Sequence, residues 1–132
     1  MDSGHEAVKV IRCEGVPTSH LPFSPALQVG DWVFVSGQAS VDSQGEIIND
    51  TFEGEFRRSI ENLRAVLKGA GLDLRNVVQV RSYVDNPEDL EEYNRLYREY
   101  FNEPLPVRTT LVGCLGGALK YEVDATAYAK KR

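Results

Sequence analysis

The stretch that decides the fold is Leu105-Pro106-Val107-Arg108-Thr109-Thr110, followed after a glycine-rich connection by Lys120-Tyr121-Glu122-Val123-Asp124-Ala125. Both segments read as strands, and successive side chains of a strand point to opposite faces of a sheet. Arg108 and Thr110 therefore share one face of the first strand. In the second strand every other residue is apolar, which marks the core side; these residues are Tyr121, Val123, Ala125 and Ala127. Glu122 is thus predicted to point away from the core.

The connection between these two strands sets the predicted position of Arg108 relative to Glu122. If residues 113–117 form a hairpin, the strands pair antiparallel and Arg108 lies across from Glu122. Such a pair has two interpretations. It can be an ion pair on a solvated face, which contributes at most about 1 kcal/mol. Alternatively, Arg108 can present its planar fork to the carboxylate of a small molecule. The pattern alone leaves both open.

The N-terminal half of the chain predicts three strands and one long helix. Short strands are expected at 9–13 and 26–28, and the apolar run at 32–35 predicts a strand buried on both faces. Apolar residues then recur at spacings of four and three over 52–70, which indicates a helix with one apolar stripe. Gly71 is predicted to end this helix in the left-handed conformation.

The C-terminal half adds a strand, a helix and the two strands described above. Residues 76–84 alternate as a strand does, and Asn86 is a helix N-cap that precedes a proline in the first turn. The apolar stripe of this second helix is aromatic, which is typical of core packing rather than of a platform for nucleic-acid bases; its residues are Leu90, Tyr93, Tyr97 and Tyr100 or Phe101. The order βββ-α-β-α-ββ predicts an α+β fold, a mixed sheet with two helices on one face.

Composition narrows the class of protein. With 132 residues and 42% hydrophobic content, the chain is expected to form one domain over 1–132. No apolar run approaches the roughly 20 residues that span a bilayer, and residues 1–5 lack the features of a signal peptide, so we expect a soluble, cytoplasmic protein. The net charge of −5, with a single basic cluster at 130–132, argues against a nucleic-acid partner.

The potential metal ligands and nucleophiles of the chain are isolated in sequence. Cys13 and Cys114 are far apart, and neither His5 nor His20 has a partner at a metal-binding spacing. We therefore predict reduced thiols, no zinc site and no histidine-activated nucleophile.

Four motifs carry a resemblance to a known family. They are Val35-Ser36-Gly37-Gln38, Ser59-Ile60-Glu61-Asn62-Leu63, Pro106-Val107-Arg108-Thr109-Thr110 and Glu122-Val123-Asp124-Ala125. In this order and spacing, from about residue 22 to residue 129, the chain resembles the reactive intermediate deaminase (Rid or YjgF) family. The resemblance implies a chorismate-mutase-like fold and a closed homotrimer with active clefts between subunits. It also implies cofactor-free hydrolytic deamination of 2-imino acids, or of their enamine tautomers, to 2-keto acids and ammonia.

The resemblance also assigns roles to individual residues. Arg108 takes the place of the arginine that binds the substrate carboxylate, and Glu122 that of the glutamate that positions water. The pocket residues that it implies are Phe23, Ser36, Gly37, Asn94 and Thr110. Two of these have a structural interpretation as well: Gly37 fits a turn that ends a strand as well as it fits a close approach to ligand, and Asn94 fits an ordinary surface amide.

The chain departs from the family pattern at three places. It has Leu21-Pro22-Phe23-Ser24 where many members carry Gly-Pro-Tyr-Ser, so the pocket lacks a phenolic hydroxyl. Thr110 stands where some members have a cysteine. The connection at 114–117 lacks the usual Leu-Pro pair. These differences bear on the choice of substrate and leave Arg108 and Glu122 in place.

Three alternatives to imine deamination follow from the same residues. The pocket can bind a 2-keto acid or a similar metabolite without catalysis, with Arg108 as its anchor. It can act on a larger conjugated enamine such as 2-aminomuconate, which the apolar Phe23 favours. Family members have also been called single-strand endoribonucleases or translation inhibitors, but the acidic chain lacks the histidine or lysine constellation that RNA cleavage requires.

Overall fold

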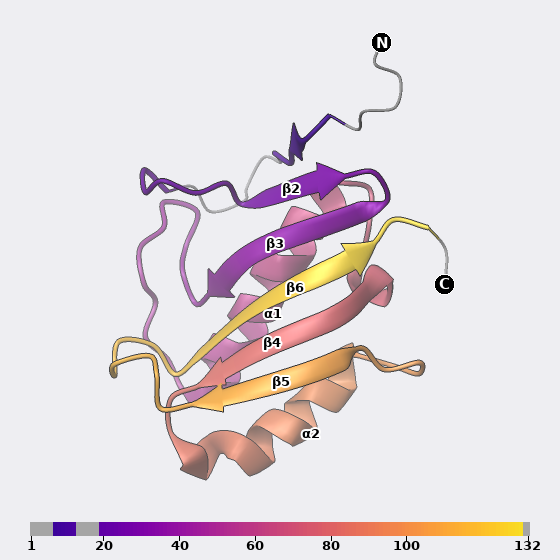
Figure 1. Ribbon diagram of the computed structural model, residues 1–132. Helices are drawn as coiled ribbons and strands as arrows, with labels where there is room; N and C mark the ends of the chain where they lie inside the picture. Colours follow the sequence, from indigo (N-terminus) through magenta and orange to yellow (C-terminus); the bar gives the residue numbers. More distant parts are fainter. Residues whose placement is uncertain (1–6, 13–18, 131–132) are drawn as a thin grey trace.

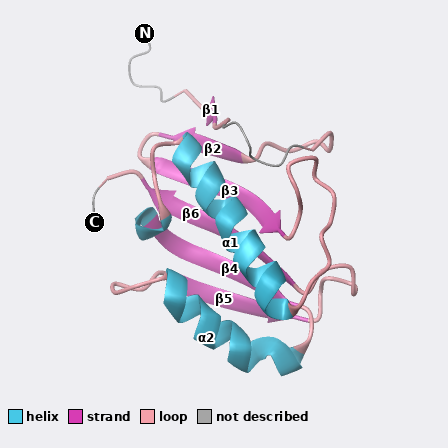
Figure 2. Cartoon of the chain, turned by 180° about the vertical axis from the view of Figure 1, so that it is seen from behind, coloured by secondary structure: helices cyan, strands magenta, loops and turns pink. Residues whose placement is uncertain are grey.

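A six-stranded mixed sheet carries both long helices on one of its faces (Figures 1 and 2). The computed structural model describes residues 7–12 and 19–130. The strand order is β1-β2-β3-β6-β4-β5. The elements are β1 (Lys9–Val10), β2 (Ala26–Val29), β3 (Trp32–Ala39), α1 (Phe52–Gly69), η1 (Leu74–Asn76), β4 (Val77–Val84), η2 (Pro87–Asp89), α2 (Leu90–Tyr100), β5 (Val107–Val112) and β6 (Tyr121–Tyr128). The predicted α+β class and the predicted order of elements are confirmed; Cys13 of the first predicted strand lies outside the described residues.

Local signals at the ends of α1 explain its bounds. The Thr51 side chain accepts a hydrogen bond from the Gly54 amide, and Glu53 and Glu55 place negative charge in the first turn, where the helix dipole favours it. At the other end Gly71 has φ +76° and its amide donates to the Lys68 carbonyl. A residue with a side chain adopts that conformation at a cost, so the predicted glycine stop is confirmed.

The core lies between the helices and the sheet. The Tyr121 ring of β6 meets Phe56 of α1 at a centroid distance of 4.6 Å and Tyr93 of α2 at 5.9 Å. Both helices therefore pack on the face to which Tyr121, Val123, Ala125 and Ala127 point, as predicted. Among the described residues, no helix has the length and apolar character needed to cross a membrane.

The predicted hairpin between the last two strands is wrong. β5 pairs parallel with β4, with Arg108 opposite Val80, and β6 pairs antiparallel with β3 and β4. A helix that joins two neighbouring strands returns the chain in the same direction, so α2 imposes the parallel pairing. Asp85, just beyond β4, accepts hydrogen bonds from the amides of Leu115 and Gly117. This anchor holds the glycine-rich connection over the end of β4, and β6 enters on the far side of that strand.

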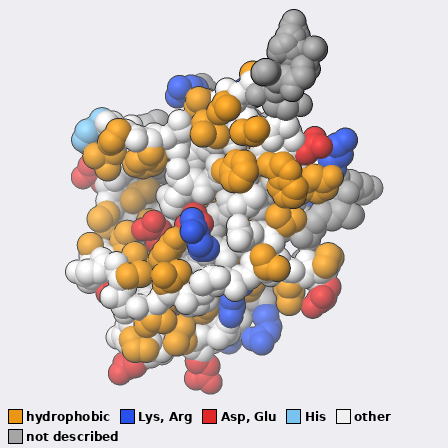
Figure 3. Space-filling model, in the orientation of Figure 1, with side chains coloured by type: hydrophobic (Ala, Val, Ile, Leu, Met, Phe, Trp, Pro, Cys, Tyr) orange, Lys and Arg blue, Asp and Glu red, His pale blue; other side chains and the backbone are white. Residues whose placement is uncertain are grey.

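The prediction that β3 is buried on both faces is also wrong for the single chain. Val33 and Val35 are buried under α1, but Trp32 and Phe34 are 44% and 48% exposed on the face without helices. We call this the open face. Apolar side chains gather on it (Figure 3), and the exposed ones on β5 include Val107 and Leu111. Two helices cover only one side of the sheet, so the open face remains uncovered in the single chain.

Candidate functional site

Arg108 lies in an aromatic cradle on the helix face of the edge strand β5. Its guanidinium carbon is 4.8 Å from the ring centroids of both Tyr93 and Tyr97 on α2. A cation over an aromatic face is held by the ring quadrupole, which contributes about 0.5–2 kcal/mol per contact. Among residues 7–12 and 19–130, no carboxylate or carbonyl engages this guanidinium. The two rings thus hold the guanidinium, while its N–H groups have no acceptor among the described residues and can bind a ligand.

Two hydroxyl groups complete the cradle. The Tyr93 and Thr110 hydroxyls share a hydrogen bond of 2.8 Å, which ties the β5 strand to α2 next to Arg108. The Tyr97 hydroxyl is buried and has no hydrogen-bond partner within the described part of the chain. Burial raises the pKa of Tyr97, while the nearby Arg108 charge acts weakly in the opposite direction. The Tyr97 phenol is therefore a neutral group beside the cation.

Glu122 lies on the open face, between β3 and β4. Its register partners are Ala39 and Tyr83, and its carboxylate rests against the backbone of Gly37, where a Cβ atom would overlap Oε2. Glycine is therefore required at position 37 for this carboxylate position. Burial raises the pKa of Glu122, and the neighbouring Asp124 raises it further. A carboxylate whose pKa is shifted toward neutrality is suited to take up and return a proton.

The structure separates the two predicted catalytic residues. Arg108 points to the helix face and Glu122 to the open face, and β4 lies between their strands. The cross-strand pairing of Arg108 with Glu122, predicted from the hairpin register, is therefore wrong. The alternative interpretation, in which Arg108 and Glu122 form an ion pair on a solvated face, is therefore wrong as well. We call the surroundings of Arg108 and of Glu122 the two candidate half-sites.

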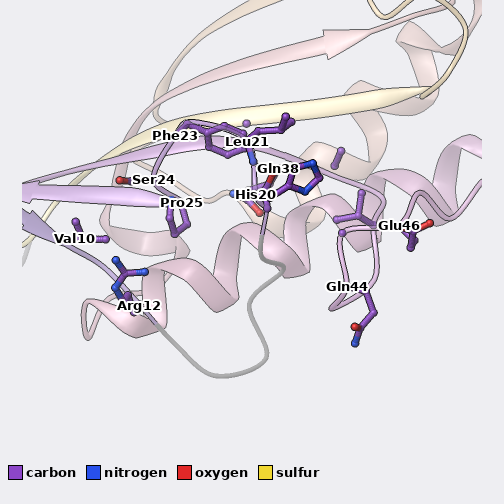
Figure 4. Close-up of a pocket in the computed structure, with 15 residues that line it drawn as sticks. Val10, Arg12, His20, Leu21, Phe23, Ser24, Pro25, Gln38, Gln44 and Glu46 are labelled. Atoms are coloured by element: carbon purple, nitrogen blue, oxygen red, sulfur yellow. Dashed lines mark hydrogen bonds between the residues drawn. The ribbon is translucent and has the colours of Figure 1, made fainter.

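The remaining predicted pocket residues divide between these half-sites. Phe23 and Gly37 line a cavity of about 620 Å³ together with Leu21, Gln44 and Glu46, and Figure 4 shows Phe23 beside Leu21. Through Gly37 this cavity adjoins Glu122. The Ser36 hydroxyl is occupied, since it donates to the Ser24 carbonyl at 2.6 Å.

The other two pocket residues belong to the Arg108 side. Thr110 lies next to Arg108 on the helix face, and Asn94 is half-buried on α2, between the two tyrosines of the cradle in sequence. The Asn94 amide group donates to the Leu90 carbonyl at 3.1 Å, so one of its donors is already used within the helix. Its amide oxygen and its second N–H remain available to a ligand.

Sequence reasoning missed the aromatic cradle. Tyr93 and Tyr97 were assigned to the core, and they are buried there, but they also hold Arg108. The signal was the β-α-β order itself: a crossover helix packs on the strands that it joins, so its stripe meets the core-facing residues of the strand that follows. The described residues contain no group of three or more His, Cys, Asp or Glu side chains placed to hold a metal ion.

Comparison with known proteins places the chain in a family. The model of the family described as Endoribonuclease L-PSP matches residues 14–129. A RutC family protein of Pyrococcus abyssi is 37% identical over 92% of this chain and 98% of its own length. The mouse 2-iminobutanoate/2-iminopropanoate deaminase is 32% identical over 90% of each chain.

Solved structures agree with the sequence relatives. A putative endoribonuclease of Thermotoga maritima superimposes with a TM-score of 0.85 at 30% identity, covering 93% of this chain and 98% of its own. The structure of E. coli TdcF with bound serine gives a TM-score of 0.82 at 28% identity, with 92% and 99% coverage. The chain therefore belongs to the endoribonuclease L-PSP family, the reactive intermediate deaminase or Rid/YjgF family that its motifs resemble.

Proposed function

We propose that this protein hydrolyses 2-imino acids, or their enamine tautomers, to 2-keto acids and ammonia. Two relatives, from mouse and human, are named 2-iminobutanoate/2-iminopropanoate deaminases and are 32% and 29% identical to this chain. The observation that carries the proposal is the Arg108 guanidinium, held over two aromatic rings with no hydrogen-bond or ion-pair partner among the described residues. A planar fork of this kind matches a carboxylate through two parallel hydrogen bonds.

We propose further that the complete site forms between subunits of a closed trimer. Arg108 and Glu122 lie on opposite faces of one sheet, so one chain cannot apply both to the same small substrate. Burial of the open face against other copies would cover Trp32 and Phe34, which are about half exposed in the single chain. In this assembly the Arg108 half-site of one subunit faces the Glu122 half-site of the next.

The reaction follows from the groups that the two half-sites contribute. Arg108 binds the substrate carboxylate, which places the C2=N bond of the protonated imine beside Glu122. Water attacks C2 while the Glu122 carboxylate takes one proton from it, giving a carbinolamine. Glu122 returns that proton to the amine nitrogen. The C2–N bond then breaks, the hydroxyl proton is lost, and the products are a 2-keto acid and ammonia.

The half-buried position of Glu122 is explained better by this catalytic cycle than by a purely structural role. Its carboxylate makes no ion pair with a described lysine or arginine, and burial raises its pKa toward the value at which a group both accepts and donates protons. A non-catalytic keto-acid binder would need Arg108 but would have no use for such a group.

The test is turnover of imines generated in situ by an amino-acid oxidase, measured as keto-acid derivative and as released ammonia. The parent should accelerate imine loss over the uncatalysed rate, and Arg108→Lys should lose most of that acceleration. Arg75→Lys is the matched control, because Arg75 is exposed at η1, away from both half-sites. Tight 2-keto acid binding without any turnover would establish the binder instead.

A further inference from the structure

A polar network on the open face converges on Asp124, two residues beyond Glu122 on β6. Arg81 Nε donates to Asp124 Oδ1 at 2.9 Å, and the Tyr83 hydroxyl donates to Oδ2 at 2.6 Å. Both donors come from β4, where Arg81 is the register partner of Asp124 and Tyr83 is that of Glu122. Each Asp124 oxygen thus has its own donor, and the carboxylate is fixed in one orientation.

This network lies directly beside Glu122. Residues two apart on a strand share a face and are separated by about 7 Å along it. Tyr83 is the register partner of Glu122, yet its hydroxyl serves Asp124. Burial and the bond to Asp124 raise the pKa of Tyr83 to about 12, so it remains a donor throughout the neutral range.

The other charged groups near Glu122 can be enumerated element by element among the described residues. From β3, Gly37 and Ala39 contribute no charge. Arg12, His20 and Glu46 line the cavity that Gly37 also lines, so they face Glu122 across that glycine. From β4, Tyr83 and Arg81 are already bound to Asp124. Preceding β6, Lys120 is directed to the buried Glu55, 3.3 Å from its carboxylate. Asp124 differs from these groups because it shares a strand and a face with Glu122 and is held in place by two hydrogen bonds.

We propose that Asp124, held by Arg81 and Tyr83, is a further positioning residue of this site, one whose negative charge makes Glu122 a stronger proton acceptor. The inference rests on the proposed function, since it concerns the proton that Glu122 takes from the attacking water. The strength of a general base rises with its proton affinity, so a fixed neighbouring carboxylate increases the rate without touching the substrate. Arg81 moderates this effect, because its positive charge offsets part of the Asp124 field.

Two substitutions test the role with opposite signs. Asp124→Asn keeps an acceptor oxygen but removes the charge, so the acid limb of the pH profile of kcat/KM should move down by about half to one pH unit. Arg81→Gln removes the offsetting cation and should move the same limb up by about a few tenths of a unit, since Arg81 is largely exposed. If Asp124 only holds the sheet together, both variants should lose stability or activity while the acid limb of the pH profile stays where it is in the parent.

A second readout makes the outcome independent of turnover. In protein labelled with carbon-13 at glutamate side-chain carboxyls, the Glu122 signal, assigned by its loss in Glu122→Gln, should titrate at lower pH in Asp124→Asn and at higher pH in Arg81→Gln. A parent that turns over no imine overturns the proposed function. Turnover by the parent with unmoved limbs and titrations overturns the role of Asp124 alone. If Asp124→Asn does not fold, the upward shift in Arg81→Gln decides the question.

Discussion

Replacing Arg108 with lysine tests the carboxylate clamp at constant charge. Lysine offers a single point charge where arginine offers two parallel donors, so one of the two charge-assisted hydrogen bonds to the substrate is lost. That loss is worth about 1.5–3 kcal/mol, which corresponds to a drop of about 10- to 150-fold in kcat/KM. The cradle adds to the contrast, because the Arg108 guanidinium carbon lies 4.8 Å from both ring centroids and a lysine ammonium lacks the fork that these contacts position.

The same substitution should leave folding nearly unchanged. Arg108 makes no hydrogen bond or ion pair to another described residue, and the stacking contacts can be replaced in part by an ammonium over the rings. We therefore expect a melting temperature close to that of the parent, with loss in both imine turnover and 2-keto acid affinity. A lysine variant with parental turnover would refute the clamp, and a large drop in melting temperature would show that Arg108 serves the fold.

Four further outcomes test the remaining steps. Glu122→Gln should lower turnover by about 100-fold, the lower end of general acid-base effects, while 2-keto acid affinity stays near the parental value; an equal loss in both would make Glu122 a binding residue. Gly37→Ala should also lower turnover, because the added methyl group displaces the Glu122 carboxylate, with little change in stability since a flexible side chain can yield. Phe34→Asp, on the open face, should convert a trimer into smaller species in light scattering and abolish turnover; a parent that is monomeric at micromolar concentration would contradict the shared site. Glu55→Ala should lower the free energy of unfolding, measured with urea, by about 3–5 kcal/mol, because this buried carboxylate accepts hydrogen bonds from the backbone amides of Asp50 and Lys120.

The sequence by itself determined the order of the elements and the core-facing side of β6. The alternation of Tyr121, Val123 and Ala125 placed Glu122 on the face away from the core, and the glycine at position 71 located the end of α1. These signals are local: side-chain period and backbone conformation depend on neighbours in the chain. The four motifs were also sufficient to identify the family, which the family match over 14–129 confirms.

The tertiary structure alone decided which strands are neighbours, and hence what Arg108 contacts. Strand pairing depends on long-range crossovers, and a glycine-rich connection can close a hairpin or cross the end of another strand with equal local ease. Here Asp85 anchors that connection over β4. As a result Arg108 meets Tyr93 and Tyr97 instead of Glu122, because β5 follows a crossover helix to the edge of the sheet while β6 enters its centre.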